Sequence, residues 1–480
     1  MKMDSDFVMT INGQAVTNEN TQPVYNPATR SVFAQVPDAS KSQLDDTVSA
    51  ARQAFGSWSV TPVEERQAAL ERFADLIEEN AEGIMALLTR EQGKPRAGAE
   101  WEVFGSAAWL RATGSLRLPE ETVDETDERR VITRHTPVGV VGAIVPWNFP
   151  ILLAIWKIAP ALMAGCTIIV KPSPYTPLCD LKIVELAQQV LPPGVLSAVS
   201  GGDDLGKWMT AHPDINKIAF TGSTETGRHV MRSAADTIKR VTLELGGNDP
   251  AIVLPDVDAK ALAPELFWAA FQNSGQFCNS TKRLYIHEAV YDEVRDALVD
   301  FITNNISVGD GADADTDLGP IQNSMQYGKV QGYFADCHSN GYQFALGGEI
   351  DESAAGWFVP VSLVDNPPED SRIVQEEPFG PILPLLKWSD EADVIARAND
   401  TIYGLGASVW GKDLEAVERI GRQLEAGTVW LNEVHQYSPF QAFGGHKQSG
   451  LGCENSLHGL MEYTNWQTTT LNKNRIASDG

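Results

Sequence analysis

The chain has 480 residues, of which 43% are hydrophobic and 21% charged, and its formal net charge is −27. This is the composition of an ordinary globular protein, and the length is sufficient for two or three domains. Because nucleic acids and anionic membranes both bind through a basic face, the negative charge argues against either as a partner.

The beginning of the chain carries no visible targeting signal. Residues 1–10, MKMDSDFVMT, include two aspartates and no apolar run of signal-peptide length, so we expect no secretory signal. The most apolar region, 137–170, is broken by prolines, Asn148 and Lys157. It therefore lacks the run of roughly 18 apolar residues that a membrane-spanning helix needs. A buried strand–loop–helix–strand is the better interpretation.

The first half of the chain changes from helices to alternating strands and helices. Residues 40–115 place apolar side chains at three- and four-residue intervals, which is typical of amphipathic helices. From residue 139 onward, short apolar strands alternate with helical segments, and this predicts βαβ units and a mostly parallel sheet covered on both faces. Strands are predicted at 139–146, 166–172, 216–220, 240–244 and 250–255, and a helix at 180–191.

A second alternating set begins near residue 260 and predicts a second α/β domain. Its helices are predicted at 261–275, 291–304 and 390–400, and its strands at 283–287, 381–388 and 427–432. Residues 119–136 differ from both sets because they are charged and β-branched. Such a ribbon is typical of an exposed hairpin or of an arm that pairs with another subunit.

Five cysteines stand far apart, at positions 166, 179, 278, 337 and 453, and no CxxC pair occurs. This spacing favours reduced thiols in a cytoplasmic protein over disulfides or a zinc site. The eight histidines also lack metal-ligand spacing, so we expect no metal. Most free cysteines are small buried side chains. Cys278 lies at a loop junction in SGQFCNSTKR, where a nucleophile and a buried small side chain are both open interpretations.

Three other stretches could carry chemistry. Residues 222–227 run from a strand into a helix, where free N–H groups favour phosphate, although such turns are structural more often than functional. Glu244 ends an apolar strand before two glycines, and there a desolvated carboxylate could act as a general base or bind backbone N–H groups. Asn148, in PWNFP, could donate to a developing oxyanion or form an Asx turn. The GxGxxG motif of ordinary Rossmann folds does not occur.

Seven motifs follow one another along the chain: PWNFP, KPSPYTP, FTGSTETG, LELGG, GQFC, EEPFGP and FGGHKQSG. Together they resemble the NAD(P)-dependent aldehyde dehydrogenase superfamily, over nearly the whole chain. The resemblance implies an α/β fold with a Rossmann-type cofactor domain, an α/β catalytic domain and a small β oligomerisation arm. It assigns residues 1–118 and 138–245 to the cofactor-binding domain, 246–445 to the catalytic domain, and 119–137 and 464–480 to the arm.

The resemblance also implies catalytic residues. Cys278 matches the nucleophile that attacks the aldehyde carbon, and Asn148 with the Cys278 N–H matches the oxyanion hole. Glu244 matches the general base that activates water for deacylation. Lys157 and Glu454 match residues that relay the proton of this base. The residue types suit the chemistry, because a thiolate is a strong nucleophile and a thioester is a reactive acyl donor.

A cofactor site is implied in the same way. Glu377 matches the carboxylate that holds the nicotinamide ribose, and Phe379 matches a residue that packs beside the same ring. Lys171 matches the lysine that binds the adenosine ribose. The other cofactor-binding residues implied by the resemblance are Trp147, Ser173, Gly222, Ser223 and Gly246.

Three residues depart from the family pattern. Pro174 stands where NAD-preferring members usually carry a glutamate that repels the 2′-phosphate of NADP, and no arginine or lysine appears in this stretch to attract that phosphate. We therefore predict that NAD is preferred and NADP is accepted. The second departure is Ala442, which stands in place of the proline in the usual PFGG. The third is Cys453, which stands where the family often has an arginine directly before the glutamate that Glu454 matches. Both departures bear on local packing and on the Glu454 relay.

The positions that match the family's substrate tunnel are mostly aromatic or apolar. They are Phe149, Leu153, Trp156, Gln272, Phe277, Asn279, His435 and Tyr437. Such a lining favours aliphatic or aromatic aldehydes. A short anionic substrate is less favoured, because Trp156 occupies a position where semialdehyde-acid enzymes commonly carry arginine.

The implied function is the hydrolytic, NAD(P)-dependent oxidation of an aldehyde to a carboxylic acid through a cysteine thiohemiacetal and thioester, in a homodimer or homotetramer. One alternative is a CoA-acylating semialdehyde dehydrogenase, which Glu244 disfavours because that branch typically lacks this base. A second alternative is a cofactor-independent cysteine esterase. A third is a binding protein that keeps the fold without turnover.

Overall fold

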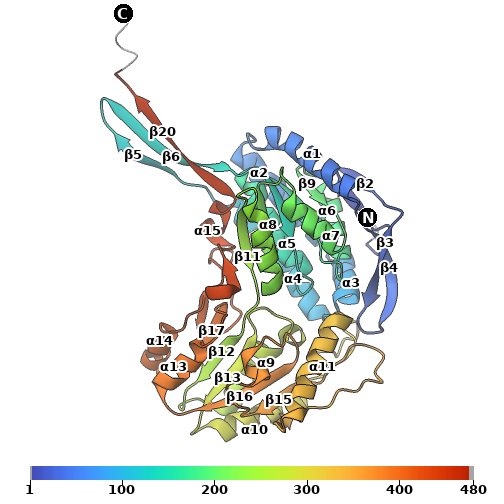
Figure 1. The fold of residues 1–480 in the computed structure, drawn as a ribbon, viewed down its shortest axis with the longest axis vertical. Coiled ribbons are helices and arrows are strands. Elements are labelled where there is room, and N and C mark those ends of the chain that lie inside the picture. Colours follow the sequence, from blue (N-terminus) through green and yellow to red (C-terminus); the bar gives the residue numbers. More distant parts are fainter. Residues whose placement is uncertain (1–2, 475–480) are drawn as a thin grey trace, which may run out of the picture.

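The computed structural model describes residues 3–474 (Figure 1), so the part of the expected arm at 475–480 lies outside the described residues. Two large sheets form the body of the protein. The strands of the first are β1 (Met9–Ile11), β2 (Gln14–Val16), β7 (Val140–Ile144), β8 (Thr167–Lys171), β9 (Leu196–Ala198), β10 (Lys217–Thr221), β11 (Arg240–Glu244) and β19 (Gly450–Leu451). Their order is β19-β11-β10-β7-β8-β9-β1-β2, and the five strands from β11 to β9 are parallel.

The order of this sheet contains a reversal. The chain runs from β7 to β8 and β9 on one side, and then places β10 and β11 on the other side of β7. In an open α/β sheet, a ligand crevice lies beyond the carboxyl ends of the strands where the order reverses. The carboxyl ends of β7 and β10 therefore mark where a nucleotide would bind.

Five helices contact the strands of the first sheet: α1 (Lys41–Trp58), α5 (Pro150–Ala164), α6 (Leu178–Ala187), α7 (Asp203–Ala211) and α8 (Thr224–Ala235). Three more, α2 (Val63–Glu79), α3 (Ala81–Gln92) and α4 (Arg96–Gly114), form an outer layer on α5 and α6. Side chains fix their starts: Ser40 forms a capping box with Gln43 at α1, and Ser223 accepts from the N–H of Thr226 at α8. None of the described helices is long and apolar enough to cross a membrane.

The second large sheet holds β12 (Asp249–Val253), β13 (Thr281–His287), β14 (Gln343–Leu346), β15 (Ser362–Asp365), β16 (Ile382–Trp388), β17 (Gly406–Trp410) and β18 (Thr428–Leu431). Its order is β14-β15-β16-β13-β12-β17-β18, with only β14 antiparallel. The helices that accompany this half of the chain are α9 (Ala259–Phe271), α10 (Tyr291–Asn305), α11 (Ser324–Ser339), α12 (Arg372–Gln375), α13 (Glu391–Asn399), α14 (Leu414–Gly421) and α15 (Ser456–Met461).

The helix predicted to reach residue 275 ends earlier. α9 stops at Phe271, and a short 3₁₀ segment, Gln272–Gly275, follows it. Asn273 and Ser274 have φ values of 52° and 58°, in the left-handed region where a helix cannot continue. This break turns the chain toward Cys278, so the missed helix end is part of the loop that positions the thiol.

A three-stranded antiparallel sheet projects from the body (Figure 1). It consists of β5 (Glu120–Glu125), β6 (Arg129–Pro137) and β20 (Thr464–Asn472), in the order β20-β6-β5. The hairpin expected at 119–136 and the strand expected near 470 thus lie side by side, with every residue of β20 paired to β6. The remaining hairpin is formed by β3 (Thr21–Asn26) and β4 (Ser31–Pro37).

Candidate active site

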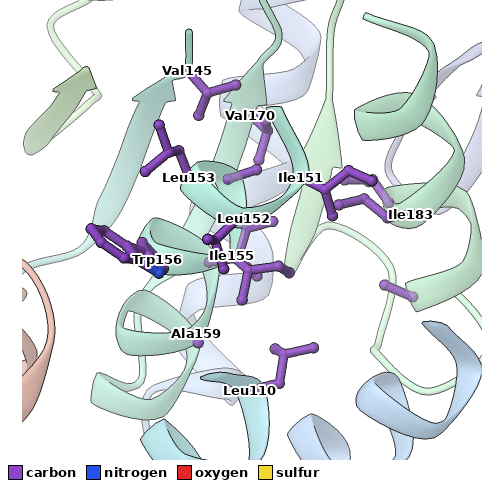
Figure 2. Close-up of a cluster of buried hydrophobic side chains, with 14 of the residues drawn as sticks. Leu110, Val145, Ile151, Leu152, Leu153, Ile155, Trp156, Ala159, Val170 and Ile183 are labelled. Carbon is purple, nitrogen blue, oxygen red and sulfur yellow. The ribbon is translucent and has the colours of Figure 1, made fainter. Parts of the chain in front are cut away.

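The helix α5 places several of the expected residues, because it starts directly after the loop that contains Asn148. All fifteen of its residues are buried, and its apolar side chains pack in every direction, as Figure 2 shows for Ile151, Leu152, Leu153, Ile155 and Trp156. A helix that is apolar all round belongs in a protein core. The buried α5 is therefore a rigid support for the one charged side chain that it carries, Lys157.

A buried ion pair holds the start of α5. Glu102 Oε1 accepts from the backbone N–H groups of Ile151 and Leu152, at 2.9 and 3.2 Å, where a helix has unpaired donors. Its other oxygen pairs with Lys94, whose Nζ also donates to the Asn148 carbonyl at 2.9 Å. Through Lys94, the backbone of Asn148 is thereby linked to Glu102 on α4, which also holds the start of α5.

The side chain of Asn148 points toward the loop that carries the thiol. Asn148 Nδ2 donates to the carbonyl of Gln276 at 3.1 Å, and Asn273 Nδ2 donates to the carbonyl of Asn148 at 3.1 Å. Asn148 is 4% exposed. A fixed amide beside the Cys278 loop is what an oxyanion donor requires, since it needs no reorganisation during reaction.

Cys278, Glu244 and Glu454 meet in a single pocket, although they are far apart in the sequence. The residues that line this pocket are Trp101, Phe149, Leu152, Leu153, Trp156, Thr221, Glu244, Leu245, Phe277, Cys278, Asn279, Tyr437, Phe443 and Glu454. Glu244 is the last residue of β11, and Cys278 follows the 3₁₀ turn after α9. The pocket thus lies between the edge of the first sheet and the loops of the second.

The buried carboxylate of Glu244 has no hydrogen-bond partner on either oxygen within residues 3–474. Burial, reinforced by the neighbouring Glu454, holds the pKa of Glu244 well above its usual range. Beside it, Lys157 Nζ lies 2.5 Å from Glu454 Oε1 and 2.7 Å from Thr221 Oγ1. A carboxyl that readily holds a proton therefore stands next to a buried charged pair, an arrangement suited to proton transfer.

The thiol of Cys278 is also held in its neutral form. Burial raises its pKa to about 12, and the nearby charge of Lys282 opposes that shift. The nucleophilic form therefore has to be produced by proton transfer as the thiol reacts. The same pocket holds two carboxyls: Glu454 is ion-paired with Lys157, and Glu244 has no hydrogen-bond partner among the described residues.

A second cavity lies at the crevice that the strand order marks. It is lined by Ile144, Lys171, Gly202, Asp203, Gly206, Lys207, Thr210, Ala211, Phe220, Thr226, His229, Val230 and Ser233. Lys171 ends β8 and is 5% exposed, and burial lowers its pKa to about 8. Its ammonium has three donors, and within the part of the chain that the structure describes it donates only to the Pro172 carbonyl, at 3.2 Å. Two N–H groups are left for a ligand, which fits the ribose hydroxyls of a dinucleotide.

The expected nicotinamide end lies closer to the thiol. Glu377 Oε1 accepts from the N–H of Gly247 at 3.2 Å, and a Cβ on Gly246 would stand 2.5 Å from Glu377 Oε2. Glycine at 246 is therefore required for this carboxylate to approach. Trp147 and Phe379 pack edge to face with ring centroids 5.3 Å apart. Two aromatic rings and a carboxylate are residue types that suit a nicotinamide ring and its ribose.

The expected substrate residues divide into two groups. Phe149, Leu153, Trp156, Phe277, Asn279 and Tyr437 line the pocket. His435 lies behind them: its ring packs 4.5 Å from that of Phe277, and its Nδ1 lies 3.1 Å from Gln272 Oε1. His435 and Gln272 thus support the lining from outside.

Sequence reasoning missed Trp101, Leu152, Thr221, Leu245 and Phe443 in the lining. Trp101 is the most informative of these, because it lies on α4 and contacts Phe149 edge to face at 5.9 Å. No motif in the sequence marks it, because only the fold brings its ring to Phe149. Among the cofactor residues, Ser173 accepts from the Tyr175 N–H, and the Gly222 N–H donates to the Glu244 carbonyl.

Comparison with known proteins decides the family. The family model described as "Aldehyde dehydrogenase family" matches residues 15–469. This chain belongs to the aldehyde dehydrogenase family. It is an NAD(P)-dependent aldehyde dehydrogenase, as its motifs and its α/β fold predicted.

Relatives and solved structures match this aldehyde dehydrogenase over nearly its full length. The chain is 41% identical to a putative aldehyde dehydrogenase, FUS7, of Gibberella fujikuroi, over 97% of this chain and 99% of the relative. It is 39% identical to the phenylacetaldehyde dehydrogenase of Pseudomonas fluorescens, over 95% and 94% of the two chains. The NAD+ complex of an aldehyde dehydrogenase from Bacillus cereus matches with a TM-score of 0.94 and 36% identity, over 98% and 97%.

Proposed function

We propose that this enzyme oxidises aliphatic or aromatic aldehydes to carboxylic acids by a hydrolytic route, with Cys278 as the nucleophile and Glu244 as the base. The observation that carries the proposal is the meeting of a thiol, an unpartnered carboxyl and an apolar lining in one pocket. Formation of NADH from aldehyde and NAD in the absence of CoA tests it. Strict dependence on CoA would favour the acylating alternative, and ester hydrolysis without aldehyde oxidation would favour an esterase.

In the first half of the reaction, Cys278 Sγ bonds to the aldehyde carbon as its proton leaves to Glu244. The aldehyde oxygen becomes an oxyanion, which the Asn148 amide and the Cys278 N–H stabilise. Trp147, Phe379 and Glu377 would hold the nicotinamide riboside of the cofactor, and Lys171 would hold its adenosine ribose. The bound cofactor supplies the hydride acceptor. The product on the protein is a thioester on Cys278.

Before the second half, Glu244 must lose the proton that it took from the thiol. It then takes a proton from water, whose oxygen attacks the thioester carbon; the C–S bond breaks, the acid leaves, and the Cys278 thiolate recovers a proton from Glu244. Among the described residues, the neighbouring Glu454 has one oxygen without a hydrogen-bond partner and the other paired with Lys157, so the buried pair offers a path away from the pocket. Glu454 and Lys157 therefore serve as the proton relay.

The raised pKa of Glu244 predicts how the fold depends on pH. The folded protein favours the protonated carboxyl of Glu244. The contribution of this group to the free energy of unfolding is therefore fully present below pH 4.5, its ordinary pKa, and is lost as pH rises through its raised pKa. Glu244→Gln mimics the protonated form at every pH. Thermal unfolding should show the variant melting above wild type at about pH 9, and the difference should shrink toward about pH 5. A difference that grows toward acid would contradict the raised pKa.

We further propose that NAD is preferred and NADP is accepted. Pro174 lies beside a surface pocket with Gln22, Tyr25, Tyr175 and Trp357, and none of the described residues that line this pocket is charged. In the neighbouring cavity that holds Lys171, Asp203 stands beside Lys171 and Lys207, so a 2′-phosphate meets charges of both signs. Discrimination against NADP should therefore be weak.

Replacing Pro174 by glutamate should increase the preference for NAD. A carboxylate beside a phosphate is repelled, and the ratio of kcat/KM for NAD to that for NADP should rise on the order of 10-fold. Pro174→Gln is the matched control, since it changes the shape of the site without adding charge. If both variants keep the wild-type ratio of kcat/KM for NAD to that for NADP, Pro174 does not face the 2′ position of the adenosine ribose.

The lining also indicates the substrate. It is mostly aromatic and aliphatic, and the described lining residues include two carboxylates but no arginine or lysine. A semialdehyde acid would place its carboxylate there without a counter-ion, at a cost in desolvation. Asn279 Nδ2 donates to the Tyr437 hydroxyl oxygen at 2.6 Å. The hydroxyl hydrogen is therefore available to donate to a polar substituent on the substrate. Aromatic aldehydes with an acceptor group should therefore be accepted.

We also propose that the chain forms a homodimer or homotetramer through its arm and acts in the cytoplasm, where the Cys278 thiol stays reduced. The arm exposes apolar side chains at Val123, Trp466 and Leu471. Trp466 is 72% exposed, so Trp466→Arg should leave the fold intact and weaken association. Light scattering after size-exclusion chromatography should then give a smaller mass than for wild type. An unchanged mass would remove Trp466 from the interface.

A further inference from the structure

A buried lysine that none of the steps above uses lies behind the nucleophile. Lys282 is the second residue of β13 and is 2% exposed. Its Nζ lies 2.5 Å from the Cys278 carbonyl, 3.1 Å from the Phe277 carbonyl and 3.3 Å from Glu377 Oε1. A buried ammonium is costly unless it is fully paired, and this one is paired entirely within the thiol loop and its surroundings.

The carbonyls that Lys282 holds determine where the N–H groups of the loop point. Phe277 C=O and Cys278 N–H belong to one planar peptide unit, and in a trans peptide these two bonds point in opposite directions. Fixing the oxygen on Lys282 therefore directs the Cys278 N–H to the opposite side. A positive charge on the oxygen also polarises the peptide and strengthens the N–H as a donor.

Neutral groups hold the same peptide but cannot supply this charge. The Phe277 oxygen also accepts from Ser280, through its hydroxyl at 3.1 Å and its N–H at 3.3 Å. The Cys278 oxygen, in contrast, accepts only from Lys282 among the described hydrogen bonds. Lys282 is thus the group that joins both carbonyls of the thiol loop to the carboxylate at Glu377.

We propose that Lys282 is a positioning residue that orients and polarises the Cys278 peptide N–H as an oxyanion donor and couples the thiol loop to Glu377. This inference rests on the proposed roles of Cys278 and Glu377. The charge of Lys282 also acts on its neighbours: burial raises the pKa of Asp249 to about 7, and Lys282 opposes that shift. The lysine is therefore the local positive centre around which the thiol, Glu377 and Asp249 are arranged.

The test compares Lys282→Met with Lys182→Met. Lys182 is also 2% exposed and forms an ion pair, with Glu185 at 3.0 Å, but it lies on α6 away from the pocket. With saturating NAD and an aromatic aldehyde, the rate constant of the first turnover should fall on the order of 10- to 100-fold in Lys282→Met and stay near wild type in Lys182→Met. Partial unfolding lowers the amplitude of this burst and not its rate constant, so a poorly folded variant remains informative.

Three outcomes are decisive. A slower first turnover at saturating NAD supports the proposal. A wild-type rate constant overturns it, and so does a loss that saturating NAD fully restores, because Lys282 would then act only through nucleotide binding. Cys278→Ala is measured in parallel: if that variant still turns over, the proposed function itself fails, whereas an inactive Cys278→Ala with a normal Lys282→Met rejects only the role of Lys282.

Discussion

Replacing Cys278 by alanine should lower the rate of aldehyde oxidation by at least roughly 10,000-fold, because the variant has no atom that can form the thiohemiacetal. Nucleotide binding should remain near that of wild type, since the groove around Lys171 lies at the ends of β7 and β10 rather than in the thiol pocket. Steady-state NADH formation and fluorescence titration with NADH measure the two quantities.

Cys337→Ala is a suitable control for this prediction. Cys337 is a free, fully buried thiol in α11, outside the residues that line the pocket. Its removal should cost some stability and leave kcat near wild type. Comparable losses of activity in the two variants would mean that thiol removal acts through folding, and substantial turnover by Cys278→Ala would reject Cys278 as the nucleophile.

Replacing Glu244 by glutamine should separate the two halves of the reaction. The amide cannot take a proton from water, so deacylation should slow about 100- to 10,000-fold. The first turnover should slow less, because the proton of a thiol can leave to solvent without Glu244, whereas water needs a base to attack the thioester. Rapid mixing should then show a burst of about one NADH per active site followed by a slow steady state.

The pH dependence of the wild-type steady state provides a second check on Glu244. A base with a raised pKa is protonated and inactive over a wider acid range, so turnover should rise with pH through that raised value and then level off. In Glu244→Gln this limb should disappear. A burst-free progress curve with wild-type steady-state turnover would show that Glu244 is not the deacylation base.

The sequence predicted the parts of this fold that depend on local patterns. Apolar runs such as 140–144 and 217–221 are buried parallel strands, and the charged ribbon 119–136 is an exposed hairpin. The helix end at Phe271 was missed because Asn273 and Ser274 have left-handed backbones that tertiary contacts maintain. β19 was missed because two residues, Gly450 and Leu451, pair with β11 from a distant part of the chain.

The residues of the candidate site divide in the same way, into those with a local sequence signal and those without one. Glu244 at a strand end and Asn148 in a rigid turn attract notice by themselves, whereas Cys278 becomes a candidate nucleophile only through its place in an ordered set of motifs. Trp101 and Lys282 carry no local signal, because their importance depends on which carbonyls and rings the fold brings to them. Contacts between distant segments are therefore what the structure adds.

The most direct test of the account is to trap the acyl enzyme. Glu244→Gln is mixed with an aromatic aldehyde and NAD, quenched in acid and digested, and its cysteine peptides are analysed by mass spectrometry. If Cys278 is the nucleophile, the peptide that contains it should carry the acyl group, and the peptides that contain Cys166, Cys179, Cys337 and Cys453 should not. NADH formation with Cys278 unmodified, or an acyl group on another cysteine, would contradict that role.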